Sequence, residues 1–339
     1  MIKGLIFKNS FIFKNVKPFR NGIHSWTNRN MQITKMGSGA TYKEVRIPIE
    51  YGHLAAKEYG CESGKKMIAL HGWQDNAGSF DPLIPHLSTD LHIVAVDRAG
   101  HGLSSHKPFG HPYYFWDYIN QIRIVADFYN WKEFSMLTHS VAYTFAILFA
   151  SVYPQSVRKV IGIDDVLSGT MYSSELMPNV MKNNIDRFIE LQEKVNNEPP
   201  AYSIDDAVKL MINGTYNALT EEGAKVLMKR GVKPLENGKV VFSRDIRVKN
   251  VWDNGLLCGD ITKAIISNVK CDVLLIKGTE SSYTKDEIMN ELLEIYKAKC
   301  PTFEMVKLEG NHYVHFCNPQ LVASLVNSFM LDLNIKDSL

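Results

Sequence analysis

The sequence predicts an α/β protein with a mostly parallel sheet, helices on both faces of that sheet and one helical insertion. Short runs of consecutive apolar residues, such as residues 91–97, alternate along the chain with longer helical patterns. Strands that are apolar throughout are typical of parallel sheets covered by helices on both faces. From residue 165 to residue 267 the alternation stops and helical patterns dominate. We therefore expect one α/β core interrupted by a helical cap after its sixth strand.

Apolar patterns and turn residues predict the individual strands and helices along the chain. An antiparallel hairpin comes first, with strands at 42–49 and 53–59 around a Tyr51-Gly52 turn. The apolar patterns then predict strands at 66–71, 91–97, 134–137 and 157–163, and helices at 80–87, 116–130 and 142–150. Within the insertion, Ser203 and Thr220 have the properties of helix N-caps. After it we expect a strand at 271–277, a helix at 285–299, a strand at 302–308 and a closing helix at 319–333. The predicted core is thus 41–164 and 268–335, and the predicted cap is 165–267.

The first 40 residues differ in charge from the rest of the chain. Eight of the 38 Lys and Arg residues precede Glu44, the first acidic residue, so the remaining 30 face all 36 Asp and Glu residues. A basic, acid-free leader predicts a mitochondrial transit peptide. The alternatives are a disordered basic tail or translation from Met31, with a location in the cytoplasm or, from the C-terminal Ser338-Leu339, the peroxisome. Nothing outside the leader indicates nucleic-acid binding.

The cysteines and the hydropathy pattern exclude several classes of protein. The five cysteines are odd in number, scattered and without CxxC spacing (Cys61, Cys258, Cys271, Cys300, Cys317). This pattern favours a reducing compartment over a disulfide framework or a zinc site. No apolar run reaches the roughly 18 residues that a membrane span needs. With 45% hydrophobic and 22% charged residues, the composition is that of a globular protein with a sizeable core.

A serine lies at an abrupt turn between the strand at 134–137 and the helix at 142–150. In that layout the hydroxyl of Ser140 is held away from the backbone, where a base can reach it, and the helix N-terminus faces a developing oxyanion. The usual form of this turn is G-x-S-x-G, because glycine relieves crowding next to the strained serine. Here Thr138 and Ala142 take the two glycine positions. The turn alone is therefore a weak motif.

A serine nucleophile also needs a base and an orienting acid, and candidates for both follow in the chain. His312 lies directly after the last strand and is the candidate base, with a packed loop histidine as the alternative; we expect nearby His315 to be structural. Two acids compete for the third position. Asp164 follows the strand at 157–163, and Glu280 follows the strand at 271–277. The sequence leaves this choice open, including the case in which neither acid serves.

Two further loops follow strands of the predicted sheet. The backbone N–H groups of Trp73 and Val141 are the candidate oxyanion hole, and Gly72 permits a close backbone approach. The turn 97–102 (Asp-Arg-Ala-Gly-His-Gly) is expected to be structural, with Asp97 holding it by hydrogen bonds and His101 packed within it. The aromatic cluster 113–116 either lines an acyl pocket or seats the following helix.

Taken in order, these motifs resemble the α/β-hydrolase superfamily. The stretches His71-Gly-Trp-Gln-Asp-Asn-Ala-Gly-Ser-Phe80, Lys229-Arg-Gly231, Val241-Phe-Ser-Arg-Asp245 and Gly310-Asn-His-Tyr-Val-His315 are similar to the serine hydrolase-like proteins of animals, the Kraken-type group. The similarity runs from about residue 42 to residue 330. It departs at the serine turn, where relatives carry Gly-His-Ser-x-Gly-Gly.

The resemblance implies a capped serine hydrolase that needs no metal or organic cofactor. The leading hypothesis is an esterase-like enzyme that cleaves a small ester or acyl compound, with Ser140 as nucleophile, His312 as base and Asp164 or Glu280 as acid. The alternative is a catalytically impaired member that keeps the fold to bind a small apolar ligand or a protein partner. The altered serine turn favours this alternative, and the retention of Ser140 and His312 opposes it.

Overall fold

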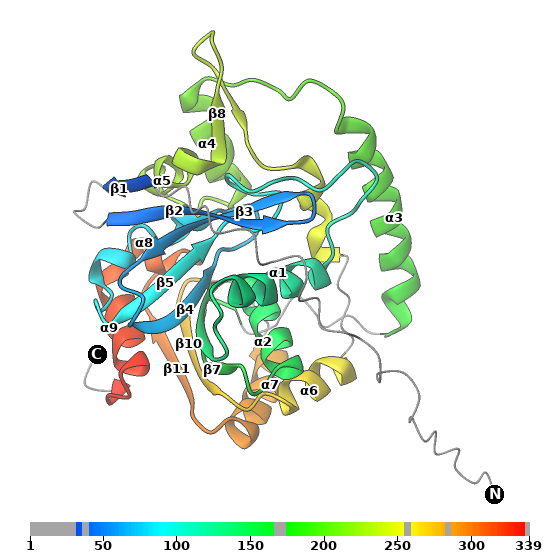
Figure 1. The fold of residues 1–339 in the computed structure, drawn as a ribbon. Helices are drawn as coiled ribbons and strands as arrows, with labels where there is room; N and C mark the ends of the chain where they lie inside the picture. Colours follow the sequence, from blue (N-terminus) through cyan, green and yellow to red (C-terminus); the bar gives the residue numbers. More distant parts are fainter. Residues whose placement is uncertain (1–31, 36–40, 166–173, 254–258, 282–285, 336–339) are drawn as a thin grey trace, which may run out of the picture. The chain divides into compact units, whose positions relative to one another are not determined.

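A computed structural model of the chain describes residues 32–35, 41–165, 174–253, 259–281 and 286–335. Its centre is a nine-stranded sheet with the order β1-β2-β3-β5-β4-β6-β7-β10-β11 (Figure 1). The strands are β1 (Gln32–Lys35), β2 (Thr41–Ile49), β3 (Gly52–Tyr59), β4 (Lys65–Leu70), β5 (Leu91–Val96), β6 (Phe134–His139), β7 (Val157–Ile163), β10 (Asp272–Gly278) and β11 (Phe303–Leu308).

Most of the sheet is parallel, as the apolar runs predict. β4, β5, β6, β7, β10 and β11 pair in parallel, and β1, β2 and β3 form an antiparallel edge that joins at β5. All six residues of β5 and of β6 are buried. Strands that are covered on both faces cannot alternate apolar with polar residues, which explains the runs seen in the sequence. The α/β fold class is therefore confirmed.

Helices cover both faces of the sheet and bury two separate apolar clusters. One face carries α1 (Phe115–Phe128), α2 (Ala142–Val152), α6 (Gly259–Ser267) and α7 (Asp286–Lys299). The other carries α9 (Pro319–Met330) and the 3₁₀ turns η1 (Ala77–Phe80) and η2 (Ile84–His86). The helix expected at 80–87 is thus two 3₁₀ turns. Pro82 and Pro85 each lack a backbone N–H, so a regular α-helical ladder cannot form there.

The insertion after β7 is mainly helical, with one addition that the sequence patterns did not predict. It contains η4 (Ser174–Leu176), α3 (Met177–Lys194), α4 (Ile204–Gly214), α5 (Glu221–Gly231) and η5 (Ile246–Asp253). Two short antiparallel strands, β8 (Val232–Pro234) and β9 (Val240–Phe242), follow α5. The side chains of Ser203 and Thr220 cap α4 and α5 as expected. The last helix of the expected cap range, α6, packs on α2 and α7 of the core.

The sheet begins inside the range expected for the leader, because β1 pairs with β2 through residues 32–35 and 41–44. The rest of the expected leader, residues 1–31 and 36–40, lies outside the described residues, as do Cys258 and the C-terminal residues 336–339. The other four cysteines are free thiols. Among the helices that the structure describes, none is long and apolar enough to cross a membrane.

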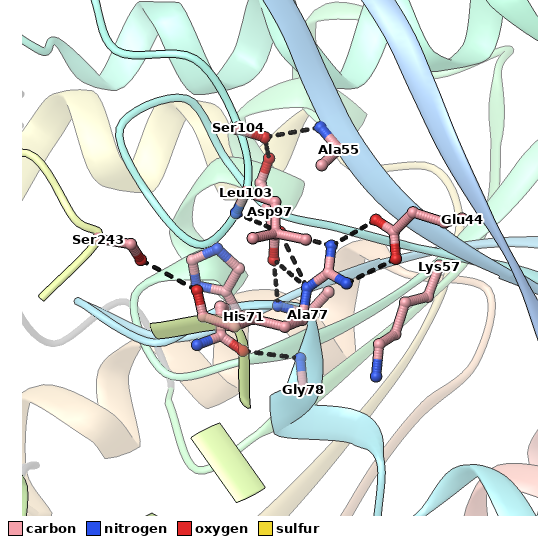
Figure 2. Close-up of polar contacts among 12 residues, drawn as sticks. Glu44, Ala55, Lys57, His71, Ala77, Gly78, Asp97, Leu103, Ser104 and Ser243 are labelled. Carbon is pink, nitrogen blue, oxygen red and sulfur yellow. Dashed lines mark hydrogen bonds and ion pairs between the residues drawn. The ribbon is translucent and has the colours of Figure 1, made fainter. Parts of the chain in front are cut away.

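A buried ion pair joins the insertion to the core. Arg230, in the last turn of α5, donates to Asp97 at the end of β5, with Nη2–Oδ2 at 2.7 Å, and to Glu44 of β2, with Nη1–Oε2 at 2.7 Å. Figure 2 shows Asp97 at the centre of these contacts, where it also accepts from the backbone of Ala77 and Leu103. Asp97 holds its own loop as expected, and in addition it holds the cap.

Candidate active site

Ser140 occupies the sharp turn between β6 and α2, and its backbone has the strained conformation that this turn requires. Its φ angle is +53°, which is uncommon for any residue other than glycine. Its backbone N–H donates to the carbonyl of Ile163 at 2.9 Å, which fixes the turn against the neighbouring strand β7. The turn therefore forms in a chain that lacks both of the usual glycines.

The residues at the two glycine positions are accommodated below the turn. Thr138 and Ala142 are both fully buried, and the Thr138 hydroxyl donates to the carbonyl of Ile161 at 2.9 Å. The hydroxyl thus has a partner within the sheet, and the side chain is not left with an unsatisfied polar group. The core thus accommodates Thr138 and Ala142 at the two positions where glycine is usual.

Tyr143, which follows Ala142, points into the core and does not line the cavity beside Ser140. A Cβ on Gly162 of β7 would lie 2.6 Å from the Tyr143 ring, so this glycine makes room for the tyrosine. The adjacent strand β7 thus provides the space that the Tyr143 ring occupies.

His312 and Asp164 lie in direct contact beside this turn. His312 follows β11 on a loop that Gly310 enters with a φ of +137°. Its Nδ1 lies 2.6 Å from Oδ2 of Asp164. The backbone carbonyl of His312 is also 3.0 Å from Nε2 of His139, the residue before Ser140. Two contacts therefore fix the position of the His312 ring and its loop relative to the serine turn.

Asp164 is buried at the end of β7 and accepts three hydrogen bonds. Besides His312, the Ser281 hydroxyl donates to Oδ2 at 2.5 Å and the Gly278 N–H donates to Oδ1 at 3.0 Å. Burial raises the pKa of this carboxyl, but the hydrogen bonds from His312 and Ser281 outweigh it, and the net shift is downward. Asp164 is therefore a carboxylate at neutral pH.

The structure separates the two acids that the sequence left open. Glu280 is exposed at the start of the loop after β10, and its backbone N–H donates to the carbonyl of Gly310 at 2.9 Å. Its neighbour Ser281 donates to Asp164, as described above. The geometry favours Asp164 as the acid that orients His312.

The protonation state of His312 suits a base. Burial lowers the pKa of its imidazole, and the hydrogen bond from its ring to Asp164 raises it only in part. The net pKa lies below the ordinary value of 6.5, so the ring is neutral at pH 7. With Nδ1 directed at Asp164, Nε2 is the ring nitrogen left to take a proton from a nucleophile.

The turn after β4 carries the candidate oxyanion-hole residue Trp73. A Cβ on Gly72 would lie 2.7 Å from the His139 ring, so only glycine allows the turn to approach the serine segment this closely. The Trp73 indole donates to the carbonyl of Val248 in the cap at 3.1 Å, and Gln74 has a φ of +60°. Val141 is the N-cap of α2, where helix amides favour negative charge. Both candidate residues thus stand on fixed backbone beside Ser140.

Two residues at this site were not singled out from the sequence. Asp75 is buried behind Trp73, accepts from the Tyr313 hydroxyl at 3.1 Å and lies 3.4 Å from the His139 ring. Tyr313 follows His312 directly. Their only signal in the sequence is position, because each lies within two residues of a candidate residue in a loop that follows a strand of the sheet.

The remaining candidates have structural positions. His101 is buried and its Nδ1 contacts the carbonyl of Ala99, whereas His315 is buried with Nε2 3.2 Å from the Ser79 hydroxyl. Tyr113 is buried and donates to Asp245 at 2.9 Å, and Phe115 packs in the core. The aromatic cluster 113–116 is not among the residues that line the cavity, so it seats helix α1.

A cavity of about 1540 Å³ lies between the core and the cap and reaches the serine turn. From the core, Trp73, Ser140, Asp164 and His312 line it. From the cap, it is lined by residues of α3, α4 and the segment 241–249. Within the described part of the chain, no group of three or more His, Cys, Asp or Glu side chains is arranged to hold a metal ion. The arrangement fits the binding of a small organic molecule beside a serine, a neutral imidazole and a carboxylate.

Comparison with known proteins agrees with this fold and arrangement. The α/β hydrolase fold family model matches residues 66–319. A probable serine hydrolase of Drosophila melanogaster is 33% identical over 294 residues, covering 86% of this chain and 88% of the relative. Human serine hydrolase-like protein 2 is 33% identical over 300 residues, covering 85% and 93%. The crystal structure of a hypothetical protein from Pseudomonas aeruginosa PAO1 superposes with a TM-score of 0.75 at 30% identity, covering 85% of this chain and 99% of that chain. The chain therefore belongs to the α/β hydrolase family and is similar to its serine hydrolase-like members.

Proposed function

We propose that this protein is an esterase-like serine hydrolase that cleaves a small ester or acyl compound with Ser140, His312 and Asp164. One observation carries the proposal. His312 contacts the buried carboxylate of Asp164 at 2.6 Å, and both line the same cavity as a serine whose φ is +53°. A base, its orienting acid and a serine in a strained strand-to-helix turn together make up an acyl-transfer site.

In the proposed reaction, the Ser140 hydroxyl attacks the carbonyl carbon while Nε2 of His312 takes its proton. The backbone N–H groups of Trp73 and Val141 bind the resulting oxyanion, and each such donor typically contributes about 3–4 kcal/mol to transition-state stabilisation. His312 then gives the proton to the leaving alcohol, which leaves an acyl group on Ser140. Water, deprotonated by the same imidazole, hydrolyses this acyl-enzyme, and the protein returns to its starting state.

The role of Asp164 in this scheme is positional and electrostatic. Its contact with Nδ1 keeps a proton on that nitrogen and directs Nε2 towards the substrate. The Ser281 hydroxyl and the Gly278 N–H hold the carboxylate itself. These two donors support the assignment, because an orienting acid is useful only when its own position is fixed.

A fluorophosphonate probe tests the proposal, because it reacts covalently with activated serines. The full-length protein is incubated with the probe, and the modified peptide is identified by mass spectrometry. We expect an adduct on Ser140 that is absent in Ser140→Ala and strongly reduced in His312→Gln. Circular dichroism of each variant shows that it is folded. The matched control is Ser267→Ala, which removes a hydroxyl that bonds the carbonyl of Lys263 within α6, outside the cavity lining, and this variant should label like the wild type.

A folded wild-type protein that fails to label would overturn the proposal. That result would favour the second candidate function, a catalytically impaired protein that uses the same cavity to bind a ligand. The presence of Thr138 and Ala142 in place of the glycines is the observation that keeps this candidate open.

A further inference from the structure

The cap side of the cavity carries more cationic than anionic side chains. Seven Lys and Arg residues and five Asp and Glu residues line the cavity as a whole. Five of these cations belong to α3 and to the segment 244–249: Arg187, Lys194, Arg244, Arg247 and Lys249. Two of the seven, Lys107 and Arg247, are held by the carboxylates of Asp117 and Asp245. In α3 and the segment 244–249 this leaves Arg187, Lys194, Arg244 and Lys249, whose other partners decide whether they can bind a ligand.

Arg244 makes no ion pair with any residue that the structure describes. Its guanidinium lies over the Phe242 ring, 4.3 Å from the ring centroid. Burial lowers the pKa of this side chain to about 10, and the charge of Asp75, beside the serine turn, opposes the shift. Arg244 is still protonated at neutral pH. A partly desolvated guanidinium without a carboxylate partner gains more from an incoming anion than an exposed one does.

Lys249, in the same segment as Arg244, has several cationic neighbours. Burial lowers the pKa of its ammonium, and three neighbouring cations lower it further: Arg244, Arg187 and Lys194. The ammonium makes no ion pair with a described residue, and no acidic neighbour offsets these cations. Arg187 and Lys194 share a single carboxylate, that of Glu190. Arg187, Lys194 and Lys249 are exposed to solvent, whereas Arg244 is only partly exposed. These four residues together give this side of the cavity an excess of positive charge.

The five acids of the cavity offset the charge of its seven Lys and Arg residues only in part. Asp164 is bonded to His312 and Asp245 to Arg247, so two of the five carboxylates are already engaged. Asp75 accepts from the Tyr313 hydroxyl and its charge also acts on Arg244, and Asp165 is partly exposed. Glu198 is exposed. In contrast, the α4 side of the cavity is largely apolar, with Leu210, Met211, Tyr216 and Leu219 as its lining. The two sides of the cap thus differ in the chemistry that they offer to a substrate.

We infer that the substrate of this site is an ester or other acyl compound that carries a carboxylate, and that Arg244 and Lys249 bind this carboxylate while the carbonyl reacts at Ser140. This inference rests on the proposed function and specifies its substrate class. The planar N–H groups of a guanidinium match the two oxygens of a carboxylate, and the Lys249 ammonium adds a second donor. The chemistry at the carbonyl is unchanged: water is consumed, and an acid and an alcohol are released.

Two pairs of esters test the inference, and the members of each pair differ in one charge. The first pair is 4-nitrophenyl hydrogen glutarate and its methyl ester, with the carboxylate on the acyl side. The second is 4-acetoxybenzoate and its methyl ester, with the carboxylate on the leaving group. For at least one pair we expect kcat/KM to be about tenfold or more higher for the anion, as one charge-assisted hydrogen bond would give. The preference should fall as NaCl is raised from 0.05 M to 0.5 M.

Variants locate the source of this preference. Arg244→Gln and Lys249→Gln should each reduce it, the double variant should abolish it, and Arg244→Lys should keep part of it. The hydrolysis of the methyl esters should change much less in all four. The matched control is Lys182→Gln, which removes one positive charge from the exposed surface of α3, outside the cavity lining, and should leave the preference intact.

A binding measurement separates this inference from the proposed function. Calorimetry of glutarate with the Ser140→Ala variant needs no turnover, so it remains informative if the protein proves not to be a hydrolase. We expect glutarate to bind Ser140→Ala and to bind the Ser140→Ala/Arg244→Gln variant at least tenfold more weakly. Equal rates for both members of both pairs, together with glutarate binding that is absent or unaffected by Arg244→Gln, would overturn the inference. Loss of hydrolysis with retained, Arg244-dependent glutarate binding would overturn the proposed function only.

Discussion

Two buried aspartates follow strands of the same sheet, Asp97 after β5 and Asp164 after β7, and they have different partners. Asp97 contacts the guanidinium of Arg230, which is charged at every pH at which the protein folds. Asp164 contacts the imidazole of His312, which is neutral at pH 7 and able to gain a proton. Both aspartates are buried, but only the partner of Asp164 can gain or lose a proton near neutral pH.

This difference assigns distinct roles to two similar carboxylates. The pair of Asp97 and Arg230 joins strand β5 to the cap helix α5, and Glu44 extends it to strand β2. Removing one member of a buried ion pair leaves an uncompensated charge, so such a pair acts mainly on folding. In the proposed reaction Asp164 faces a group that exchanges protons, so its removal should act mainly on the rate of that reaction. The predictions below test this division, beginning with the largest effect.

Asp164→Asn should lower kcat/KM for 4-nitrophenyl acetate by about 10⁴-fold, because an amide no longer favours the productive tautomer of His312 or stabilises its cation. The free energy of unfolding should change by only about 1 kcal/mol, because the partner left behind is a neutral ring. Steady-state kinetics and urea denaturation measure the two quantities. A loss of less than tenfold in kcat/KM would show that Asp164 does not orient the base, and Glu280→Gln would then be the variant to compare.

Asp97→Asn should show the reverse pattern. Arg230 would keep Glu44 but lose its second carboxylate, and the N–H groups of Ala77 and Leu103 would lose a charged acceptor. We expect the protein to lose about 3 kcal/mol of unfolding free energy in urea. Its kcat/KM per folded molecule should fall far less than that of Asp164→Asn. A stable Asp97→Asn variant would mean that the cap is held to the core by other contacts.

The same comparison shows what the sequence could predict. The parallel strands of the core were predictable because burial on both faces leaves a continuous apolar run, as in β5 and β6. β1, which lies in the range expected for the leader, was not predicted. Ser140, Asp164 and His312 were candidates, and Asp97 was expected to hold its loop, because each follows a strand and the carboxyl ends of parallel strands meet at one edge of the sheet. Position along the chain thus carried the information about the core.

Contacts between distant segments were not predictable in the same way. The bond between Asp164 and His312 spans 148 residues, and that between Asp97 and Arg230 spans 133, so no local pattern reveals which acid meets which base. The choice between Asp164 and Glu280, or neither, stayed open for that reason. The compensation of Tyr143 by Gly162 of another strand is equally non-local. The 3₁₀ turns at 77–86 are a different case, because Pro82 and Pro85 were visible in the sequence and outweigh the apolar pattern.

The smallest predicted effect is a shift in the pH dependence of kcat/KM, which Asp164→Asn should show and Asp97→Asn should not. His312 acts as a base only when it is neutral, so kcat/KM should rise with pH and level off above the pKa of its imidazole. Because burial lowers that pKa below 6.5, the rise should be centred below pH 6.5. The carboxylates of Asp164 and Asp75 raise this pKa, whereas His139 lowers it.

In Asp164→Asn the rise should therefore move to still lower pH, and in Asp97→Asn it should stay in place. The rate of fluorophosphonate labelling between pH 4.5 and pH 8 measures all three proteins, including the slow Asp164→Asn variant. A rise that moves to higher pH in Asp164→Asn would mean that the titrating group is not the imidazole held by this carboxylate.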